Sequence, residues 1–167
     1  MNVVIVTVST RAAAGVYPDG SGDRLAALAT RAGHTVVHRE VVPDDEARLA
    51  ALLTELCTDA SIELVITTGG TGLTPTDRTP EATASVCERL IPGIGEAIRQ
   101  ASVATVPHAM LSRGIAGIRA GTLIVNLPGS PGGAEDGWAV LATISEHAVS
   151  QIRGGDHPRP TSAPEGA

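Results

Sequence analysis

Runs rich in Val, Ile and Thr alternate along the chain with segments whose apolar residues recur at helical spacing. The first run is continuous and β-branched, which is typical of a parallel strand buried on both faces. The runs predict strands over Val3–Val8, Thr35–Val42 and Ile62–Thr68. The other segments predict helices, with leucines at 49, 52, 53 and 56 as the clearest example. The predicted helices cover about 23–32, 43–58, 79–90, 95–104 and 134–152.

Residues that favour helix ends flank these segments. Ser21 is placed to cap the helix over 23–32, and Gly33 is placed to end it. Further along, Thr79 is placed as an N-cap and Pro80 as a first-turn proline. The predicted helix boundaries therefore rest on local capping signals as well as on hydrophobic periodicity.

Two extended runs, Gly114–Arg119 and Thr122–Leu127, flank Ala120-Gly121 and predict an antiparallel hairpin. Together with the alternating strands and helices they indicate an α/β fold with three layers. We expect a mainly parallel sheet with helices on both faces and this one hairpin. Residues 1–153 are predicted to form a single domain, and 154–167, rich in Pro, Gly and small polar residues, a disordered C-terminal tail.

Composition narrows the classes of ligand. The 167 residues are 43% hydrophobic, enough for one core, but only 1% are aromatic, and Tyr17 and Trp138 stand alone. A chain without aromatic stacking platforms is a poor candidate for binding single-stranded nucleic acid. The net charge of −6 argues in the same way against duplex DNA, whose binding depends on Lys and Arg at phosphates.

All twelve basic residues other than histidine are arginines. The absence of lysine excludes a Walker-type phosphate-binding lysine, a Schiff-base lysine and a lysine general base. Any bound phosphate must therefore be held by backbone N–H groups, hydroxyls, arginine or a metal ion.

The two cysteines, Cys57 and Cys87, match no zinc or redox spacing and are predicted to be buried free thiols. No apolar run approaches the roughly 20 residues of a membrane span. Met1 leads directly into the first predicted strand rather than into a leader segment. We therefore expect a cytoplasmic protein without a membrane partner.

Three loops rich in Gly, Ser and Thr follow strand ends, at 9–22, 69–79 and 128–133. Each loop runs into a predicted helix start, where free N–H groups and the helix dipole favour an anion. Ligands of open α/β sheets bind at the carboxyl ends of the strands. The convergence of these loops predicts a site for a phosphate-bearing ligand.

The central loop carries the pattern G-G-T-G at Gly69, Gly70, Thr71 and Gly72. Glycines here allow unusual backbone angles and leave N–H groups accessible to a ligand. The same pattern is equally consistent with a tight turn that has only a structural role.

Asp77 follows the glycine loop, and Asp44 follows the preceding strand. Carboxylates beside a phosphate are repulsive unless a cation intervenes, and Mg²⁺ typically binds one or two carboxylates together with substrate phosphates. Two carboxylates from neighbouring strand ends could hold Mg²⁺. The alternative for Asp44 and Asp45 is a helix cap, and for Glu81 an interaction with the helix dipole.

Several motifs in this order resemble the molybdopterin adenylyltransferases of the MogA/MoaB type. They are TTGGTG, the following T-D-x-T-P-E-A and the later NLPGSP, and the resemblance extends over the chain up to the tail. It implies a mainly parallel sheet and, usually, a homotrimer. It also implies that Mg-ATP adenylylates the terminal phosphate of molybdopterin with release of pyrophosphate. A partner protein then inserts molybdenum.

The resemblance also implies roles for residues. Asp44 and Asp77 match the family's two catalytic acidic positions, acting through Mg²⁺. The glycine loop, Gly69 to Gly72, matches its phosphate-binding loop. Further positions match cofactor-binding segments, namely Ser9, Ser112, Arg113, Gly129 and Ser130.

The chain departs from the family pattern in two places. Ser9 is followed by Thr10 where the family often has an aspartate, and the segment 73–76 lacks the basic residue that often precedes Asp77. Arg11 or Arg78 could supply the missing positive charge. The departure leaves open a non-catalytic molybdopterin-binding or scaffolding paralogue as the alternative to an active enzyme. A different phosphoryl-transfer enzyme on the same fold is disfavoured by the full set of motifs.

Overall fold

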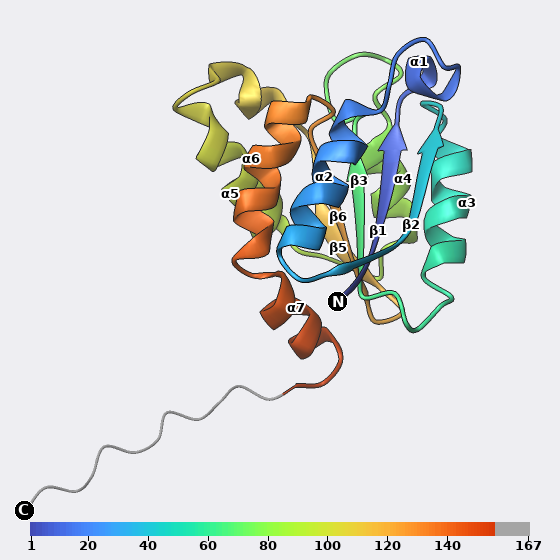
Figure 1. Cartoon of the computed structure of the whole chain (residues 1–167), viewed down its shortest axis with the longest axis vertical. Coiled ribbons are helices and arrows are strands. Elements are labelled where there is room, and N and C mark those ends of the chain that lie inside the picture. Colours follow the sequence, from blue (N-terminus) through green and yellow to red (C-terminus); the bar gives the residue numbers. More distant parts are fainter. Residues whose placement is uncertain (156–167) are drawn as a thin grey trace, which may run out of the picture.

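The computed structural model describes residues 1–155 of the chain. Six strands form one sheet in the order β2-β1-β3-β6-β5-β4 (Figure 1). The strands are β1 (Asn2–Val8), β2 (Thr35–Val42), β3 (Leu64–Thr68), β4 (Arg89–Leu90), β5 (Ala116–Arg119) and β6 (Thr122–Leu127). Strands β2, β1, β3 and β6 run parallel, whereas β5 is antiparallel to both of its neighbours.

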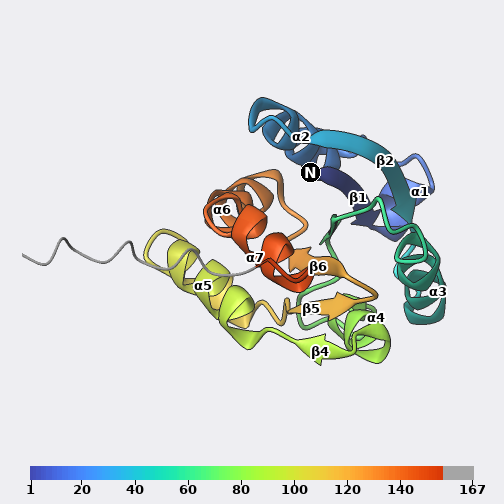
Figure 2. The same ribbon diagram turned by 90° about the horizontal axis from the view of Figure 1, so that it is seen from below.

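Helices cover both faces of the sheet, as Figure 2 shows. The helices are α1 (Thr10–Ala13), α2 (Gly20–Arg31), α3 (Glu46–Leu56), α4 (Thr79–Val86), α5 (Pro92–Val103), the 3₁₀ helix η1 (Pro107–Leu111), α6 (Pro131–Ala142) and α7 (Ser145–Ile152). Helices α2, α5, α6 and α7 pack on one face, and α3 and α4 pack on the other. Alternate residues of β1 point to opposite faces and belong to the hydrophobic cores there. Val3 and Ile5 belong to the core under α2, α5, α6 and α7, and Val4 and Val6 belong to the core under α3 and α4.

The predicted fold class, a three-layer α/β fold with one antiparallel hairpin, is confirmed. In the hairpin, Ala120 and Gly121 both have positive φ, 47° and 84°, as a two-residue turn between twisted strands requires. The described part of the chain contains no helix that is long and apolar enough to cross a membrane. A single domain over 1–153 stays a prediction, and the predicted tail lies, from residue 156 on, outside the described residues.

Two predicted caps are wrong. Helix α2 begins at Gly20 because Asp19 is its cap, and Asp19 Oδ1 accepts the Gly22 N–H at 2.9 Å. Ser21 lies buried inside the first turn instead. Thr79 is already the first residue of α4, and its buried Oγ1 has no hydrogen-bond partner. A carboxylate thus replaces the predicted hydroxyl as the cap of α2, whereas α4 begins without any side-chain cap.

Two features depart from the predicted elements after residue 86. The helix predicted over 79–90 ends at Val86, because Arg89 and Leu90 form the edge strand β4, which exists only through its pairing with β5. The helix predicted over 134–152 is two helices, α6 and α7. It breaks after Thr143, whose Oγ1 donates to the Val140 carbonyl at 2.7 Å and competes with regular helical bonding.

Both cysteines are free thiols, as predicted. Cys57 is buried and Cys87 is half-buried. Burial raises the pKa of the Cys87 thiol to about 11, so this side chain is a protonated, unreactive group at neutral pH.

Candidate functional site

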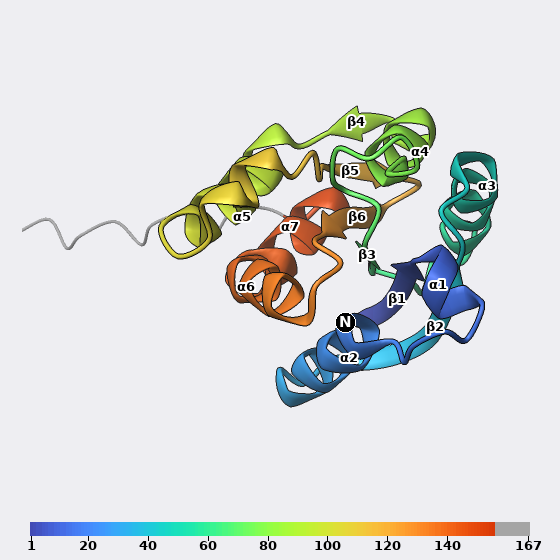
Figure 3. The ribbon, with the colours of Figure 1, turned by 90° about the horizontal axis from the view of Figure 1, so that it is seen from above.

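Four loops meet at the carboxyl ends of the parallel strands, at the edge seen from above in Figure 3. They enclose a cavity of about 420 Å³, called here the polar cavity. Its lining comes from the loops after β1, β2, β3 and β6 and from the starts of α2 and α6. The lining residues are Thr7, Val8, Ser9, Tyr17, Pro18, Asp19, Gly20, Ser21, Asp44, Thr68, Gly69, Gly70, Asp77, Gly129 and Pro131.

A second cavity of about 390 Å³, called here the apolar cavity, also borders the glycine loop. Thr71 and Gly72 line it, whereas Gly69 and Gly70 line the polar cavity. The rest of its lining comes from α5, η1 and the start of α6: Ser102, Val106, His108, Ala109, Leu111, Ser112, Pro128, Ser130, Gly132, Gly133 and Asp136. One short loop therefore contributes to two spaces of different polarity.

The glycine loop has positive φ at its first two residues, 101° at Gly69 and 62° at Gly70. A Cβ on Gly69 would lie 2.2 Å from the Val8 carbonyl oxygen, and one on Gly70 would lie 2.3 Å from Thr79 Oγ1. The missing side chains thus face the protein's own backbone and α4. Close internal packing alone therefore explains why both positions are glycine, whether or not the loop also approaches a ligand.

Arg113 supports this loop from behind and lines neither cavity. Its backbone N–H donates to the Thr71 carbonyl, and its Nε donates to the Gly72 carbonyl, both at 2.8 Å. The guanidinium also donates to the backbone oxygen of Asp77 and to the carboxylate of Glu81. The hydrogen bond to Glu81 holds the pKa of that carboxyl below its usual range. The structure therefore places Arg113 as a brace for the loop rather than in a cavity wall.

Asp44 is fixed by the residue that begins α1. Its Oδ2 accepts hydrogen bonds from the backbone N–H and the Oγ1 of Thr10, both at 2.8 Å. The cap of α3 is Asp45, whose Oδ1 accepts the Arg48 N–H at 2.8 Å. The capping alternative is therefore correct for Asp45 and wrong for Asp44.

Asp77 is held inside its own loop. Its Oδ2 accepts from the backbone N–H of Thr74 at 2.8 Å and from the Thr74 Oγ1 at 2.6 Å. Asp77 follows β3 and Asp44 follows β2, and β1 lies between these two strands. The expectation that the carboxylates come from neighbouring strands is therefore wrong, although both line the polar cavity.

The polar cavity is rich in carboxylates. Asp19, Asp44 and Asp77 line it, and no arginine or histidine does. Asp19 is paired with Arg39, 3.3 Å away, and also accepts from Thr7 Oγ1 at 2.9 Å. Within the described residues, Asp44 and Asp77 have no ion pair, and only their Oδ2 atoms accept hydrogen bonds. An anionic ligand would be repelled here unless a cation accompanied it.

Neither arginine that could have replaced the missing basic residue lines the polar cavity. Arg78 is ion-paired with Glu46 at 2.8 Å and with Glu81 at 3.5 Å. The Arg11 guanidinium lies over the Tyr17 ring, 5.0 Å from its centroid. The sequence-based hypothesis that one of them supplies positive charge at the cavity wall finds no support in their positions.

The remaining predicted residues divide between the two cavities. Ser9 and Gly129 line the polar cavity, and Ser112 and Ser130 line the apolar one. Ser130 Oγ also caps α6 by accepting the Gly133 N–H at 3.1 Å. Tyr17 lines the polar cavity but was not predicted as a site residue. Its only signal in the sequence is its position in the first strand-end loop as the sole tyrosine.

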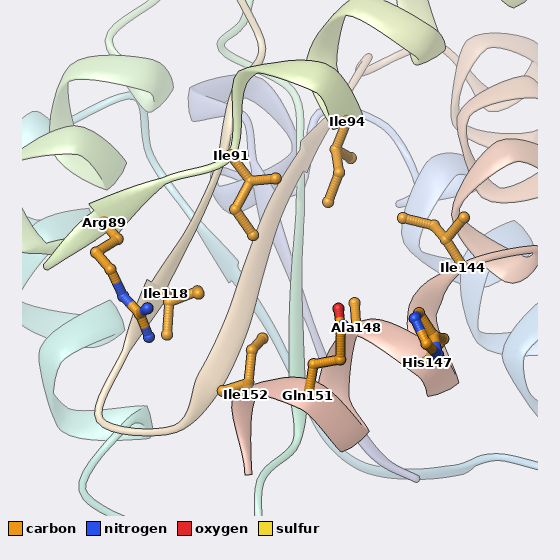
Figure 4. Close-up of a pocket in the computed structure, with 9 residues that line it drawn as sticks. All are labelled: Arg89, Ile91, Ile94, Ile118, Ile144, His147, Ala148, Gln151 and Ile152. Carbon is orange, nitrogen blue, oxygen red and sulfur yellow. The ribbon is translucent and has the colours of Figure 1, made fainter. Parts of the chain in front are cut away.

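A third cavity, of about 380 Å³, lies between α7 and the β4–β5 side of the sheet (Figure 4). Isoleucines dominate its lining, with Arg89, His147 and Gln151 at its margin. None of the predicted site residues lines it. The candidate functional site is therefore the pair of cavities at the strand ends.

Residues 4–147 match the protein family described as "Probable molybdopterin binding domain". The chain belongs to this family. The molybdopterin adenylyltransferase of Helicobacter pylori J99 is 41% identical over 133 residues, covering 78% of this chain and 76% of that protein. The Escherichia coli K12 enzyme of the same name is 43% identical over 133 residues, covering 78% and 68%.

Solved structures of this family have the same fold. The molybdopterin biosynthesis Mog protein of Mycobacterium ulcerans is 45% identical, with a TM-score of 0.84 over 90% of this chain and 98% of that one. The molybdopterin biosynthesis enzyme MoaB of Thermus thermophilus is 37% identical, with a TM-score of 0.86 over 92% and 96%. The family that the motifs indicate is confirmed, and the two enzymes at 41% and 43% identity bear the name of a nucleotidyltransferase.

Proposed function

We propose that this protein transfers the adenylyl group of Mg-ATP to the terminal phosphate of molybdopterin and releases pyrophosphate. One observation carries the proposal. Asp44 and Asp77, the two cavity aspartates without an ion pair among the described residues, line one cavity together with the first half of the glycine loop. Relatives at 41% and 43% identity bear the name molybdopterin adenylyltransferase, which supports this choice of substrates.

The chemistry of the cavity fits Mg²⁺. Each of the two aspartates keeps Oδ1 without a hydrogen-bond partner among the described residues, and hard oxygen ligands are what this ion prefers. The described residues contain no cluster of three or more acidic, His or Cys side chains that could hold a metal. Two carboxylates completed by substrate phosphates and water are a typical magnesium arrangement. When bound, the ion neutralises phosphate charge and lowers the barrier to displacement at phosphorus.

The reaction makes a bond between a phosphate oxygen of molybdopterin and the α-phosphorus of ATP. The bond from that phosphorus to the oxygen bridging to the β-phosphate breaks, and pyrophosphate leaves with the electron pair. A phosphate monoester is largely ionised at neutral pH because its second pKa is about 6. The attacking oxygen therefore needs no general base, in agreement with the absence of histidine from the polar cavity's lining.

The chain's own part is to bind and align the two substrates. We assign one cavity to each substrate, with the reacting phosphates meeting at the glycine loop that both cavities share. Some backbone N–H groups here have no acceptor among the described residues, and we propose them as the donors for phosphate oxygens: those of Gly70, Thr71 and Gly72 in the loop, Ser21 in α2 and Gly132 in α6. The brace by Arg113 keeps the loop and the Asp77 backbone in one arrangement.

One observation favours the alternative, a non-catalytic molybdopterin-binding or scaffolding paralogue. No basic side chain lines the polar cavity, and the segment 73–76 lacks the basic residue that the family resemblance leads us to expect before Asp77. Such a paralogue would keep both cavities and bind molybdopterin without turning over ATP.

Pyrophosphate release separates the two proposals. The purified protein is mixed with molybdopterin and Mg-ATP, and each component is omitted in turn. An adenylyltransferase releases pyrophosphate only when molybdopterin, ATP and Mg²⁺ are all present. Binding of molybdopterin without any pyrophosphate release would favour the scaffolding paralogue. We further propose, from the family resemblance, a homotrimer, a cytoplasmic location and a molybdenum-insertion protein as the partner that receives the product.

A further inference from the structure

The side chain of Tyr17 is anchored at the mouth of the polar cavity. Its hydroxyl lies 2.7 Å from Ser9 Oγ, and either group can donate this hydrogen bond. Ser9 is itself fixed, because its N–H donates to the Val42 carbonyl at 2.8 Å and its Oγ caps α1. Tyr17 is thus tied to the ends of β1 and β2 rather than carried on a free loop.

Two residues give the Tyr17 ring a defined environment. The Arg11 guanidinium lies 5.0 Å from the ring centroid, and Arg11 is not among the residues that line the polar cavity. Tyr17 does line that cavity, together with Asp44, Asp77 and the first two loop glycines. One face of the ring therefore lies against a cation that is not part of the cavity wall, and Tyr17 itself borders the cavity.

A role in the hydrophobic core does not explain this residue. Tyr17 is 42% exposed and belongs to neither core cluster, both of which are built almost entirely from aliphatic side chains. The other large aromatic residue, Trp138, is 5% exposed and packs edge-on against His34. Among the described residues, Tyr17 is the only large aromatic side chain that borders a site cavity.

On the basis of the proposed function, we infer that Tyr17 is a stacking platform for the heteroaromatic ring of one substrate, adenine or the pterin. The Tyr17 ring is preorganised for stacking, because one face lies against a guanidinium and the hydroxyl is hydrogen-bonded to a serine. Little conformational entropy of this side chain is therefore lost when a ligand binds. Stacking also places the ring-bearing substrate at a fixed distance from Asp44 and Asp77. Tyr17 then acts as a specificity residue for flat ligands, separate from the groups that hold phosphate.

Proton NMR tests this inference directly. The chain has one tyrosine and no phenylalanine, so the Tyr17 ring protons are separable from those of one tryptophan and five histidines. The protein is titrated with Mg²⁺ and α,β-methylene-ATP in one experiment and with molybdopterin in another. We expect ring-current shifts of the Tyr17 resonances in one of the two, which identifies the stacked ring. Binding of both ligands without such a shift in either would overturn the inference and leave the proposed function standing.

Variants exclude a merely structural role. Tyr17→Leu is expected to lower the affinity for the stacked substrate by about 10-fold, which is the size of one lost base–aromatic stack. Tyr17→Phe keeps the ring and should keep most of that affinity. Mg-pyrophosphate has no ring, and its binding should be unchanged in both variants. Val16→Ala, at the exposed neighbouring position, is the matched control. Equal weakening of pyrophosphate and substrate by Tyr17→Leu would show that the residue only shapes the loop.

Discussion

Thr10 Oγ1 and Asp44 form a reciprocal pair of hydrogen bonds that joins the loop after β1 to the loop after β2. The hydroxyl donates to Asp44 Oδ2 at 2.8 Å and accepts the Asp44 N–H at 3.0 Å. The backbone N–H of Thr10 adds a third bond at 2.8 Å. In this chain a neutral hydroxyl therefore orients the first of the two proposed magnesium ligands.

Thr10→Val removes the hydroxyl and keeps the shape and the backbone donor. We expect kcat for adenylyl transfer to fall by about 10-fold, since a misplaced group near the reacting atoms is costly even when the fold is intact. The melting temperature should change little. An unchanged kcat would show that Thr10 does not orient Asp44 for the reaction.

Asp44→Asn and Asp77→Asn test the proposed magnesium ligands. Each change keeps a hydrogen-bond acceptor for the threonine partner but removes the negative charge, and we expect transfer to fall by about 100-fold or more. Molybdopterin binding should persist in both. Asp45→Ala is the matched control, because loss of the α3 cap should lower the free energy of unfolding by about 1 kcal/mol without affecting transfer. Unfolding of both asparagine variants would assign Asp44 and Asp77 a structural role instead.

Gly70→Ala tests how tightly the glycine loop packs on α4. The new Cβ would meet Thr79 Oγ1 at 2.3 Å, and the backbone has φ 62°. Gly33→Ala has the same kind of backbone strain at φ 83° but nothing within 4 Å of the new Cβ. Both should lower the free energy of unfolding in urea by at least about 1 kcal/mol, with the larger loss at Gly70. Equal losses would mean that the loop moves away from Thr79 without cost.

Arg113→Met removes the brace and, with it, a contribution to the free energy of unfolding that depends on pH in a defined direction. The Arg113 hydrogen bond lowers the pKa of Glu81 in the folded state. The stabilisation is therefore complete above the unfolded-state value of about 4.3 and is lost as the pH falls through the lower folded-state pKa.

Urea unfolding of wild type and Arg113→Met should therefore differ most near neutral pH, and the difference should shrink in acid. Part of the difference should remain, because Arg113 also donates to backbone carbonyls. Arg24→Gln is the control, since it removes an exposed ion pair with Glu135 but leaves Glu81 and the loop brace in place. A difference that stays constant from neutral pH into acid well below the Glu81 pKa would contradict the assigned role of the Glu81 pair.

Much of the fold follows from patterns that are local in sequence. Continuous β-branched runs, leucine periodicity and the Ala120-Gly121 turn identified the parallel strands, most helices and the hairpin. The two-residue strand β4 was missed because only its partner β5 makes it a strand. The cap at Ser21 was misassigned because the Asp19 carboxylate competes for the same N–H groups. The cap at Thr79 was misassigned because Thr79 lies inside α4, which begins without any side-chain cap.

The candidate site was predictable to the extent that strand ends converge. That rule brought Asp44, Asp77 and the glycine loop to one cavity. The rule says nothing about the hydrogen-bond partners of each side chain. The sequence therefore could not predict that Arg113 braces the glycine loop or that Thr10 holds Asp44. Tyr17 was missed as a site residue because its anchoring depends on contacts with Ser9 and Arg11 that no local pattern signals.

Transfer of label from ATP carrying radioactive phosphorus at the α-phosphate tests the proposed function most directly. The protein is incubated with this ATP, Mg²⁺ and molybdopterin, and the pterin product is separated and counted. We predict labelled molybdopterin in equal amount to the pyrophosphate released, with neither formed by Asp77→Asn or without Mg²⁺. Unlabelled molybdopterin that nevertheless remains bound to the wild-type protein would contradict adenylyl transfer and support the scaffolding paralogue.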